Sequence, residues 1–172
     1  MTMSNTHKIT LSSHLTALQS VLFFMVLAII CIVLLLFFDD DETYFMERAL
    51  GIACVVLFFP SLYLHFCYYL ENKNFVITGL SDSLEIEDHK RNRKWVLSND
   101  TILSIDVYAA AGLIDWESSG GTMLHLEYHY AAIKTKDGEL ILTSLLYPYL
   151  MDIKLKFREI KVNYHKTIFA SI

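Results

Sequence analysis

Two long stretches without charged side chains constrain this chain more than any other feature. Residues 21–38 and 49–70 contain no Asp, Glu, Lys or Arg. A helix rises about 1.5 Å per residue and the hydrocarbon core of a bilayer is about 30 Å thick, so about 20 apolar residues can cross it. The first stretch is longer than the apolar part of a signal peptide and precedes no small-residue cleavage site. The sequence therefore predicts a transmembrane helical hairpin, with helices over residues 17–38 and 49–70.

The distribution of Lys and Arg predicts which way this hairpin faces. Basic flanks stay on the cytoplasmic side of a membrane, whereas acidic residues have little influence. The intervening loop is acidic and holds Arg48 as its only basic residue, while Lys8 and Lys73 lie outside the two helices. We therefore expect a multi-pass protein of the cytoplasmic (inner) membrane with both termini in the cytoplasm. Its parts would be a tail over residues 1–16, an external loop over residues 39–48 and a second tail over residues 164–172.

The end of the second apolar stretch is rich in aromatic side chains. Tyr63, Tyr68 and Tyr69 have amphipathic rings, which favour the headgroup region of a bilayer. His65 fits the same aromatic belt. A proton-relay role for His65 within the membrane is the alternative, because ionisable groups at that depth are often functional.

Beyond residue 71 the apolar runs give way to short alternating segments. Alternation of apolar and polar residues is typical of strands with one buried face. In residues 102–108 it places Leu103, Ile105 and Val107 on one face, which we expect to point inward. The whole pattern predicts strands over residues 75–78, 83–87, 95–97, 102–108, 122–130, 132–136 and 139–143.

Two further signals describe the end of this region. The Asp137-Gly138 pair lies between two predicted strands and favours a type I′ turn, because both residue types tolerate positive φ. Apolar residues then recur at steps of three and four from Leu146 to Ile160, which predicts one C-terminal amphipathic helix. The predicted fold is an α+β membrane protein, whose residues 71–163 form an antiparallel β-barrel or sandwich closed by that helix.

Three stretches give the region a family resemblance: "FVITGLSDSLEIED", "WVLSNDTILSIDVY" and "KDGELILTSLLYPYLMDIKLKFREI". With two preceding apolar helices, they resemble the bacterial pleckstrin-homology-like membrane proteins. The resemblance implies two sheets packed nearly at right angles, with the helix filling one open end. It also implies a binding or scaffolding module rather than an enzyme. The first turn, "TGLSD", lacks the basic residues with which eukaryotic relatives bind phosphoinositides.

Two groups of residues are candidates for contact with a membrane or a partner. The first is a basic run, and each such charge near an anionic leaflet contributes about 1 kcal/mol of attraction; an ordinary solvated hairpin tip is its alternative reading. The second is an apolar group in a glycine-rich loop, which either meets a partner or closes the β-domain. The basic run is Lys90, Arg91, Arg93 and Lys94, and the loop group is Leu113, Ile114 and Trp116.

A third candidate site concerns metal binding. His125, Glu127 and His129 occupy alternate positions of a predicted strand, so their side chains would share one face. Two imidazoles and a carboxylate suit zinc or iron, although a solvated outer face has the same pattern. We expect no cofactor, because the chain has no nucleophile elbow, phosphate-binding glycine loop or HExxH motif.

These observations predict a membrane-anchored, non-catalytic binding or scaffold module at the cytoplasmic face. Its expected partners are the lipid bilayer and a protein, while the lack of a basic tract argues against nucleic acid. The four-residue spacing of Ala49 and Ala53 is compatible with a homo-oligomer packed through its helices. Two alternatives stay open, namely a membrane immunity protein that neutralises a toxin and a metal-dependent enzyme.

Overall fold

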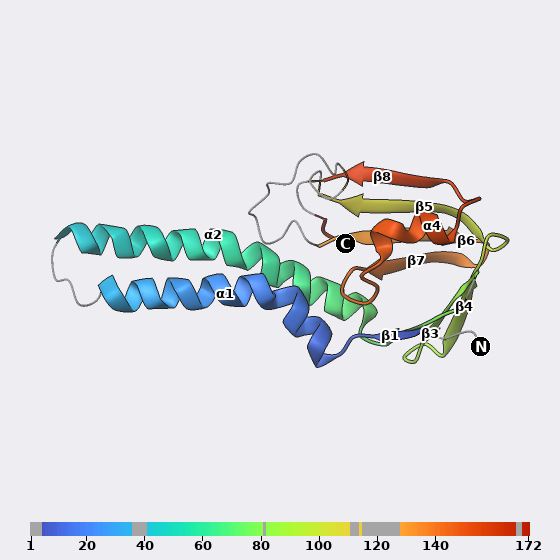
Figure 1. The fold of residues 1–172 in the computed structure, drawn as a ribbon, viewed down its shortest axis with the longest axis horizontal. Coiled ribbons are helices and arrows are strands. Elements are labelled where there is room, and N and C mark those ends of the chain that lie inside the picture. The colour runs from blue at the N-terminus through green and yellow to red at the C-terminus, as the bar shows by residue number, and fades with distance from the viewer. Residues whose placement is uncertain (1–4, 36–40, 81, 111–113, 115–127, 168–169) are drawn as a thin grey trace.

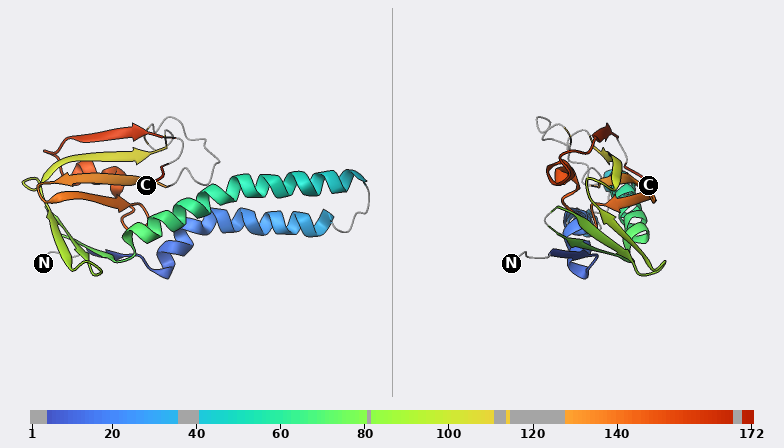
Figure 2. Two further views of the ribbon diagram at one scale, coloured as in Figure 1. Left: turned by 180° about the vertical axis from the view of Figure 1, so that it is seen from behind. Right: turned by 90° about the vertical axis from the view of Figure 1, so that its right-hand side faces the viewer.

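A computed structural model of the chain describes residues 5–35, 41–80, 82–110, 114, 128–167 and 170–172. A pair of long helices projects from one end of a domain built of two β-sheets (Figure 1). The views from behind and from the side show the same division, with the helices leaving the domain on one side only (Figure 2). The protein is therefore an elongated molecule with a helical half and a β-rich half.

The helical half consists of α1 (Leu11–Leu35) and α2 (Asp41–Asn72), which lie side by side and antiparallel (Figure 1). By length and composition, the segment Gly51–Asn72 of α2 is able to cross a membrane. A second span is formed if the two parts of α1, Leu11–Gln19 and Val21–Cys31, are taken together across the 57° bend between them. Both helices begin several residues before the predicted segments.

The first sheet contains four antiparallel strands in the order β1 (Asn5–Lys8), β2 (Phe75–Gly79), β3 (Leu84–Asp88) and β4 (Arg93–Leu97). The residues predicted as an N-terminal tail include β1, which pairs with β2 along its whole length. The alternation of "NTHK" is too short to stand out as a strand. Since β1 precedes the helices and β2 follows them, the helical hairpin is inserted between two neighbouring strands of one sheet.

The second sheet has the order β7 (Gly138–Thr143), β6 (Tyr130–Thr135), β5 (Ile102–Ala109) and β8 (Val162–Lys166). Its first three strands are antiparallel, whereas β8 joins the edge of β5 in parallel. The predicted strand over residues 122–130 falls largely outside the described residues. The other predicted strands are confirmed, but β8 lies where the sequence suggested a helix end and a tail.

The core lies between the two sheets, and one prediction about it is wrong. Ile77 and Ile86 from the first sheet meet Ile105 and Ile133 from the second in one buried cluster. Leu103, predicted to point inward, is 60% exposed, while Ile102 is 4% exposed. The register of β5 against β6 shifts between Ile102 and Ser104, and this irregularity reverses the alternation at the start of the strand.

The predicted C-terminal amphipathic helix is also wrong in length. A 3-10 turn, η2 (Leu150–Asp152), leads into the single helical turn α4 (Ile153–Lys156). Leu150, Ile153 and Phe157 are buried in the core, as the apolar spacing requires. Phe157 then leaves the helical region, with φ −113° and ψ 73°. The chain continues into β8, which satisfies the edge of β5 with backbone hydrogen bonds such as Ile105 N–H to Lys161 O, 3.1 Å.

The turn between β6 and β7 differs from the predicted type. Thr135 pairs with Gly138, so Lys136 and Asp137 occupy the two turn positions. Gly138 has φ +133°, whereas Asp137 does not have a positive φ. A type I′ turn needs positive φ at both turn residues, so this hairpin uses its glycine one position later than predicted.

Candidate functional site

The base of the helical hairpin is tied to the β-domain by the side chain of Asn72. Its Nδ2 donates to Ile141 O at 2.9 Å, and the backbone N–H of Thr143 donates to its Oδ1 at 2.8 Å. The carboxamide thus takes the place that a neighbouring strand would have at the edge of β7. Asn72 is fully buried, so the last residue of α2 and the second sheet form a continuous hydrogen-bonded unit.

A small apolar cluster reinforces this junction. Leu64 and Tyr68 of α2 are buried against Tyr128 and Leu145 of the domain. The Tyr68 hydroxyl donates to the backbone carbonyl of Ala170 at 2.7 Å, so the C-terminal end of the chain is also held there. Helix and domain therefore share a core instead of being joined by a flexible link.

Two histidines and a tyrosine form a hydrogen-bonded chain across the same junction. His14 Nδ1 lies 2.7 Å from His65 Nε2, and His65 Nδ1 lies 2.9 Å from the Tyr128 hydroxyl. His65 is only 8% exposed and faces the domain, so it is not a member of a lipid-facing aromatic belt. These hydrogen bonds link α1 to α2, and α2 to the residues that lead into β6.

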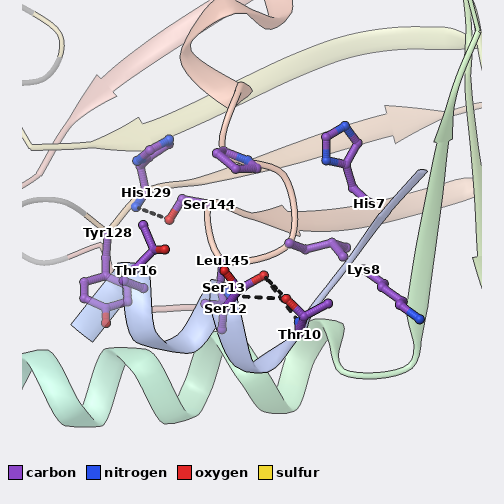
Figure 3. A pocket seen from close by; sticks show the side chains of 13 residues that line it. His7, Lys8, Thr10, Ser12, Ser13, Thr16, Tyr128, His129, Ser144 and Leu145 are labelled. Carbon is purple, nitrogen blue, oxygen red and sulfur yellow. Dashed lines mark hydrogen bonds between the residues drawn. The ribbon is translucent and has the colours of Figure 1, made fainter. Parts of the chain in front are cut away.

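A cavity of about 390 Å³ lies beside this chain, between the start of α1 and the β-domain (Figure 3). One wall runs from His7 to Ala17 and the other comprises Tyr128, His129 and residues 144–148. Thr10 and Ser13 cap the helix reciprocally, since Ser13 N–H donates to Thr10 Oγ1 at 3.2 Å and Thr10 N–H to Ser13 Oγ at 3.3 Å. Among the described residues, no acidic side chain lines the cavity, and the polar lining side chains are hydroxyls, two imidazoles and Lys8.

The predicted basic run lies close to the base of the hairpin. Asp88 pairs with Phe75, three residues beyond the end of α2, and His89 N–H donates to Asn74 O at 3.1 Å. Asp88 Oδ1 accepts the backbone N–H groups of Lys90 and Arg91 at 2.9 and 3.2 Å, which shapes the turn. The basic residues therefore gather at the end of the first sheet that meets the helices.

Acidic neighbours offset part of this positive charge. Lys94 Nζ lies 2.8 Å from Glu85 and 3.4 Å from Glu87, and Arg91 lies 3.8 Å from Asp88. Hydrogen bonds that the Lys94 ammonium donates to these two glutamates raise its pKa, and the bond to Glu85 contributes most. The two Lys94 pairs join the neighbouring strands β3 and β4 at partly exposed positions, where each ion pair is worth little. Lys90 and Arg93 form no ion pair with any described residue.

The other predicted site residues are only partly described. Ile114 is half-buried and its N–H donates to Ala110 O at 3.3 Å, while Leu113 and Trp116 lie outside the described residues. Of the metal candidates, His125 and Glu127 also lie outside them, whereas His129 is buried and lines the cavity. Within the described ranges, no three His, Cys, Asp or Glu side chains come close enough to hold a metal ion.

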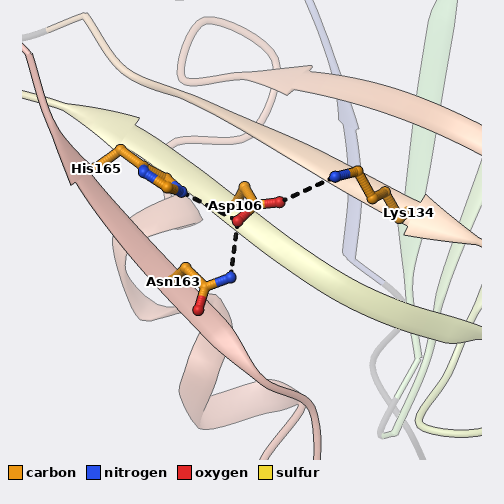
Figure 4. A network of polar contacts seen from close by, with 4 residues as sticks. All are labelled: Asp106, Lys134, Asn163 and His165. Atoms are coloured by element: carbon orange, nitrogen blue, oxygen red, sulfur yellow. Dashed lines mark hydrogen bonds and ion pairs between the residues drawn. The ribbon is translucent and has the colours of Figure 1, made fainter.

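A polar network on the second sheet was not predicted (Figure 4). Asp106 accepts from Asn163 Nδ2 at 2.8 Å and lies 3.1 Å from His165 Nε2 and 3.5 Å from Lys134 Nζ. Hydrogen bonds, first from Asn163 and then from His165, lower the pKa of the Asp106 carboxyl. The network joins β5, β6 and β8, and none of its four residues lines the cavity beside α1, so we assign it to stability.

Sequence reasoning missed the residues that build the junction because their partners are distant in the chain. His14 and His65 are 51 positions apart, and Asn72 and Thr143 are 71 apart. A signal was nevertheless available for Asn72. It is a polar residue directly after a long apolar helix, where an amide often caps a free backbone group.

Comparison with known proteins gives one finding. The family described as "PH domain" matches residues 4–154, which include both helices and most of the β-domain. No curated protein and no solved structure matches the chain.

Proposed function

This chain belongs to the PH domain family, and from that premise we propose that it is a membrane-anchored binding module whose β-domain works at the cytoplasmic face of the bilayer. PH domains are carriers of binding sites, so the family suggests binding rather than catalysis but names no ligand. We infer the membrane anchor and the cytoplasmic side from the side chains that the molecule exposes.

One observation carries the membrane anchor, namely the apolar surface that the helical hairpin exposes. Only 24% of the most apolar part of Gly51–Asn72 is buried. Water-exposed apolar surface costs about 25 cal/mol per Å², and a continuous exposed patch of this kind is typical of a membrane or partner contact. The exposed side chains of the hairpin include Phe23, Val26, Ile29, Ile30, Val55, Val56, Phe59 and Phe66.

The position of the basic residues supports the cytoplasmic side. Lys8 pairs with Val76 at the hairpin end of the first sheet, and Lys73 follows α2 directly. With the basic turn at residues 90–94, these charges surround the point where the helices enter the domain. This group of positive charges would attract anionic headgroups and favour retention of the β-domain in the cytoplasm. Lys94 contributes little, because Glu85 and Glu87 neutralise it.

We assign two surfaces to binding. The basic turn would contact anionic lipid, and the loop that contains Leu113, Ile114 and Trp116 would contact a protein partner. A homo-oligomer packed through the helices is part of the same proposal. The metal-dependent enzyme and the toxin-neutralising protein are not favoured by any contact that the structure describes.

Topology in membranes tests the proposal directly. Single cysteines placed at Thr43, Asp82 and Lys136 in a cysteine-free chain would be probed with an impermeant thiol reagent on intact cells. We expect labelling at Thr43 alone, and labelling at all three sites only after the cells are opened. Resistance of the chain to extraction by alkaline carbonate is the matching control for integration. A chain that carbonate releases, or labelling of Lys136 in intact cells, would contradict the proposal.

A further inference from the structure

The hydrogen bonds among His14, His65 and Tyr128 have no role in the function proposed above. We propose that these three residues form an acid-sensitive latch, which holds the segment Leu11–Gln19, one wall of the cavity at the base of the hairpin, against α2 at neutral pH and releases this segment when both imidazoles are protonated. The proposal does not depend on whether the hairpin crosses a membrane.

The two short contacts limit where the protons of these three side chains can be. The 2.7 Å separation of His14 Nδ1 and His65 Nε2 is a hydrogen bond only if one nitrogen carries a proton and the other a lone pair. The Tyr128 hydroxyl, 2.9 Å from His65 Nδ1, is able to donate or to accept. In the neutral state it can donate to His65 Nδ1, which leaves Nε2–H of His65 to donate to His14.

A first added proton is compatible with this geometry. It enters at His65 Nδ1, and the Tyr128 hydroxyl changes from donor to acceptor, so both hydrogen bonds survive. A second proton would have to bind His14 Nδ1, the remaining unprotonated nitrogen between the two rings. Two N–H groups would then face each other across 2.7 Å with two positive charges and no acceptor between them.

Within the part of the chain that the structure describes, the contacts of the pair offer these charges no compensation. The groups packed against the pair are uncharged: the ring of Tyr69 meets His14, the ring of Tyr128 meets His65, and Tyr68 lies behind Tyr128. No carboxylate of the described residues forms a hydrogen bond or ion pair with either imidazole. His165 differs in this respect, because Asp106 would stabilise its protonated form.

The latch connects the two walls of the cavity. His14 belongs to the segment Leu11–Gln19, which supplies one wall and is set off from the rest of α1 by the 57° bend. Tyr128 belongs to the opposite wall. His65 joins them through α2, which Asn72 fixes to β7. Loss of the His14–His65 bond removes the hydrogen bond that ties His14 to α2, so we expect Leu11–Gln19 to move relative to the domain while α2 stays docked.

A distance measurement on the full-length chain in detergent or nanodiscs tests this. Nitroxide labels at Leu11→Cys and Lys136→Cys, both exposed positions, would report the separation of the α1 start from the far end of the second sheet by pulsed electron resonance. The native cysteines at 31, 54 and 67 are replaced beforehand. We expect one narrow distance at pH 7.5 and a second, longer population at pH 5.0.

Variants assign the response to the latch. His14→Gln and His65→Gln keep a neutral polar side chain that cannot be protonated, so we expect their distances to be the same at both pH values. His165→Gln is the matched control and should respond like the parent chain. The proposal is overturned by a parent distance that does not change with pH, or by a His14→Gln chain that still responds. If His65→Gln does not fold, His14→Gln decides, since His14 is only half-buried.

Discussion

Replacement of Asn72 by alanine is the sharpest test of how the helices are attached to the domain. The substitution removes two hydrogen bonds of 2.9 and 2.8 Å and leaves Ile141 C=O and Thr143 N–H without partners at a buried edge. Each buried unsatisfied group costs about 1 to 3 kcal/mol, so the pair should cost about 2 to 6 kcal/mol. At about 1.4 kcal/mol per factor of ten, this corresponds to about 30- to 20,000-fold in the local opening equilibrium.

Hydrogen exchange of the Thr143 amide measures that equilibrium at the site. We expect it to exchange faster in Asn72→Ala by the factor above. Asn163→Ala is the matched control, because it removes one amide hydrogen bond to Asp106 on the same sheet. Unchanged exchange at Thr143 in Asn72→Ala would refute the view that this side chain completes the sheet edge.

Three further predictions concern stability, each measured by thermal or denaturant unfolding in detergent. Hydrogen bonds lower the pKa of the Asp106 carboxyl in the folded state. The stabilisation from its carboxylate is therefore present above the unfolded-state pKa of about 3.9 and is lost as the pH falls through the folded-state pKa. Asp106→Asn should be less stable than the parent at pH 7, and the two stabilities should converge in stronger acid. A difference that persists in strong acid would exclude this origin. Gly138→Ala should destabilise the folded protein by about 1 kcal/mol through the φ of +133° alone, since an added Cβ meets no atom within 4 Å. Gly51→Ala in α2 should be neutral or stabilising, because alanine favours a helix and the added Cβ again meets no atom within 4 Å. Equal effects at the two glycines would argue against backbone strain at Gly138. Phe157→Ala should cost about 3 to 5 kcal/mol, because this fully buried ring fills the core beside α4, while exposed Leu155→Ala should change stability by less than about 0.5 kcal/mol.

Local patterns predicted the parts of the fold that depend on local rules. The alternation in residues 102–108 placed Ile105 and Val107 inside correctly, and the β6–β7 hairpin was found from its turn residues. The same rule failed at Leu103, because an irregularity in the pairing of β5 changes which residues face inward without any mark in the sequence.

The C-terminal helix failed for a different reason. The apolar spacing of Leu146, Leu150, Ile153 and Phe157 correctly identified residues that are buried together. It did not show that the chain would leave the helix at Phe157, because that step is decided by the free edge of β5, about fifty residues earlier. β1 was missed likewise, since only its pairing with β2 distinguishes four residues from a tail.

The candidate site was the least predictable part. The basic residues were found from charge alone, and the pairing of β2 with β3 then places them beside the end of α2. The contacts among His14, His65 and Tyr128 required the helices to be antiparallel and α2 to be docked on the domain, and neither distance is encoded by spacing. Long-range contacts of this kind follow from the fold and are not visible before it.

The insertion of the helices between β1 and β2 has a consequence for the order in which the protein is made. β1 leaves the ribosome first but finds its partner only when residues 75–79 have followed, more than sixty positions later. Closing a loop of that length as random chain carries a substantial entropy penalty. Two helices that pair antiparallel bring the ends of this loop together beforehand. The helical hairpin thus plays the part that a two-residue turn plays in an ordinary β-hairpin, and the first sheet is completed only after the helices have assembled.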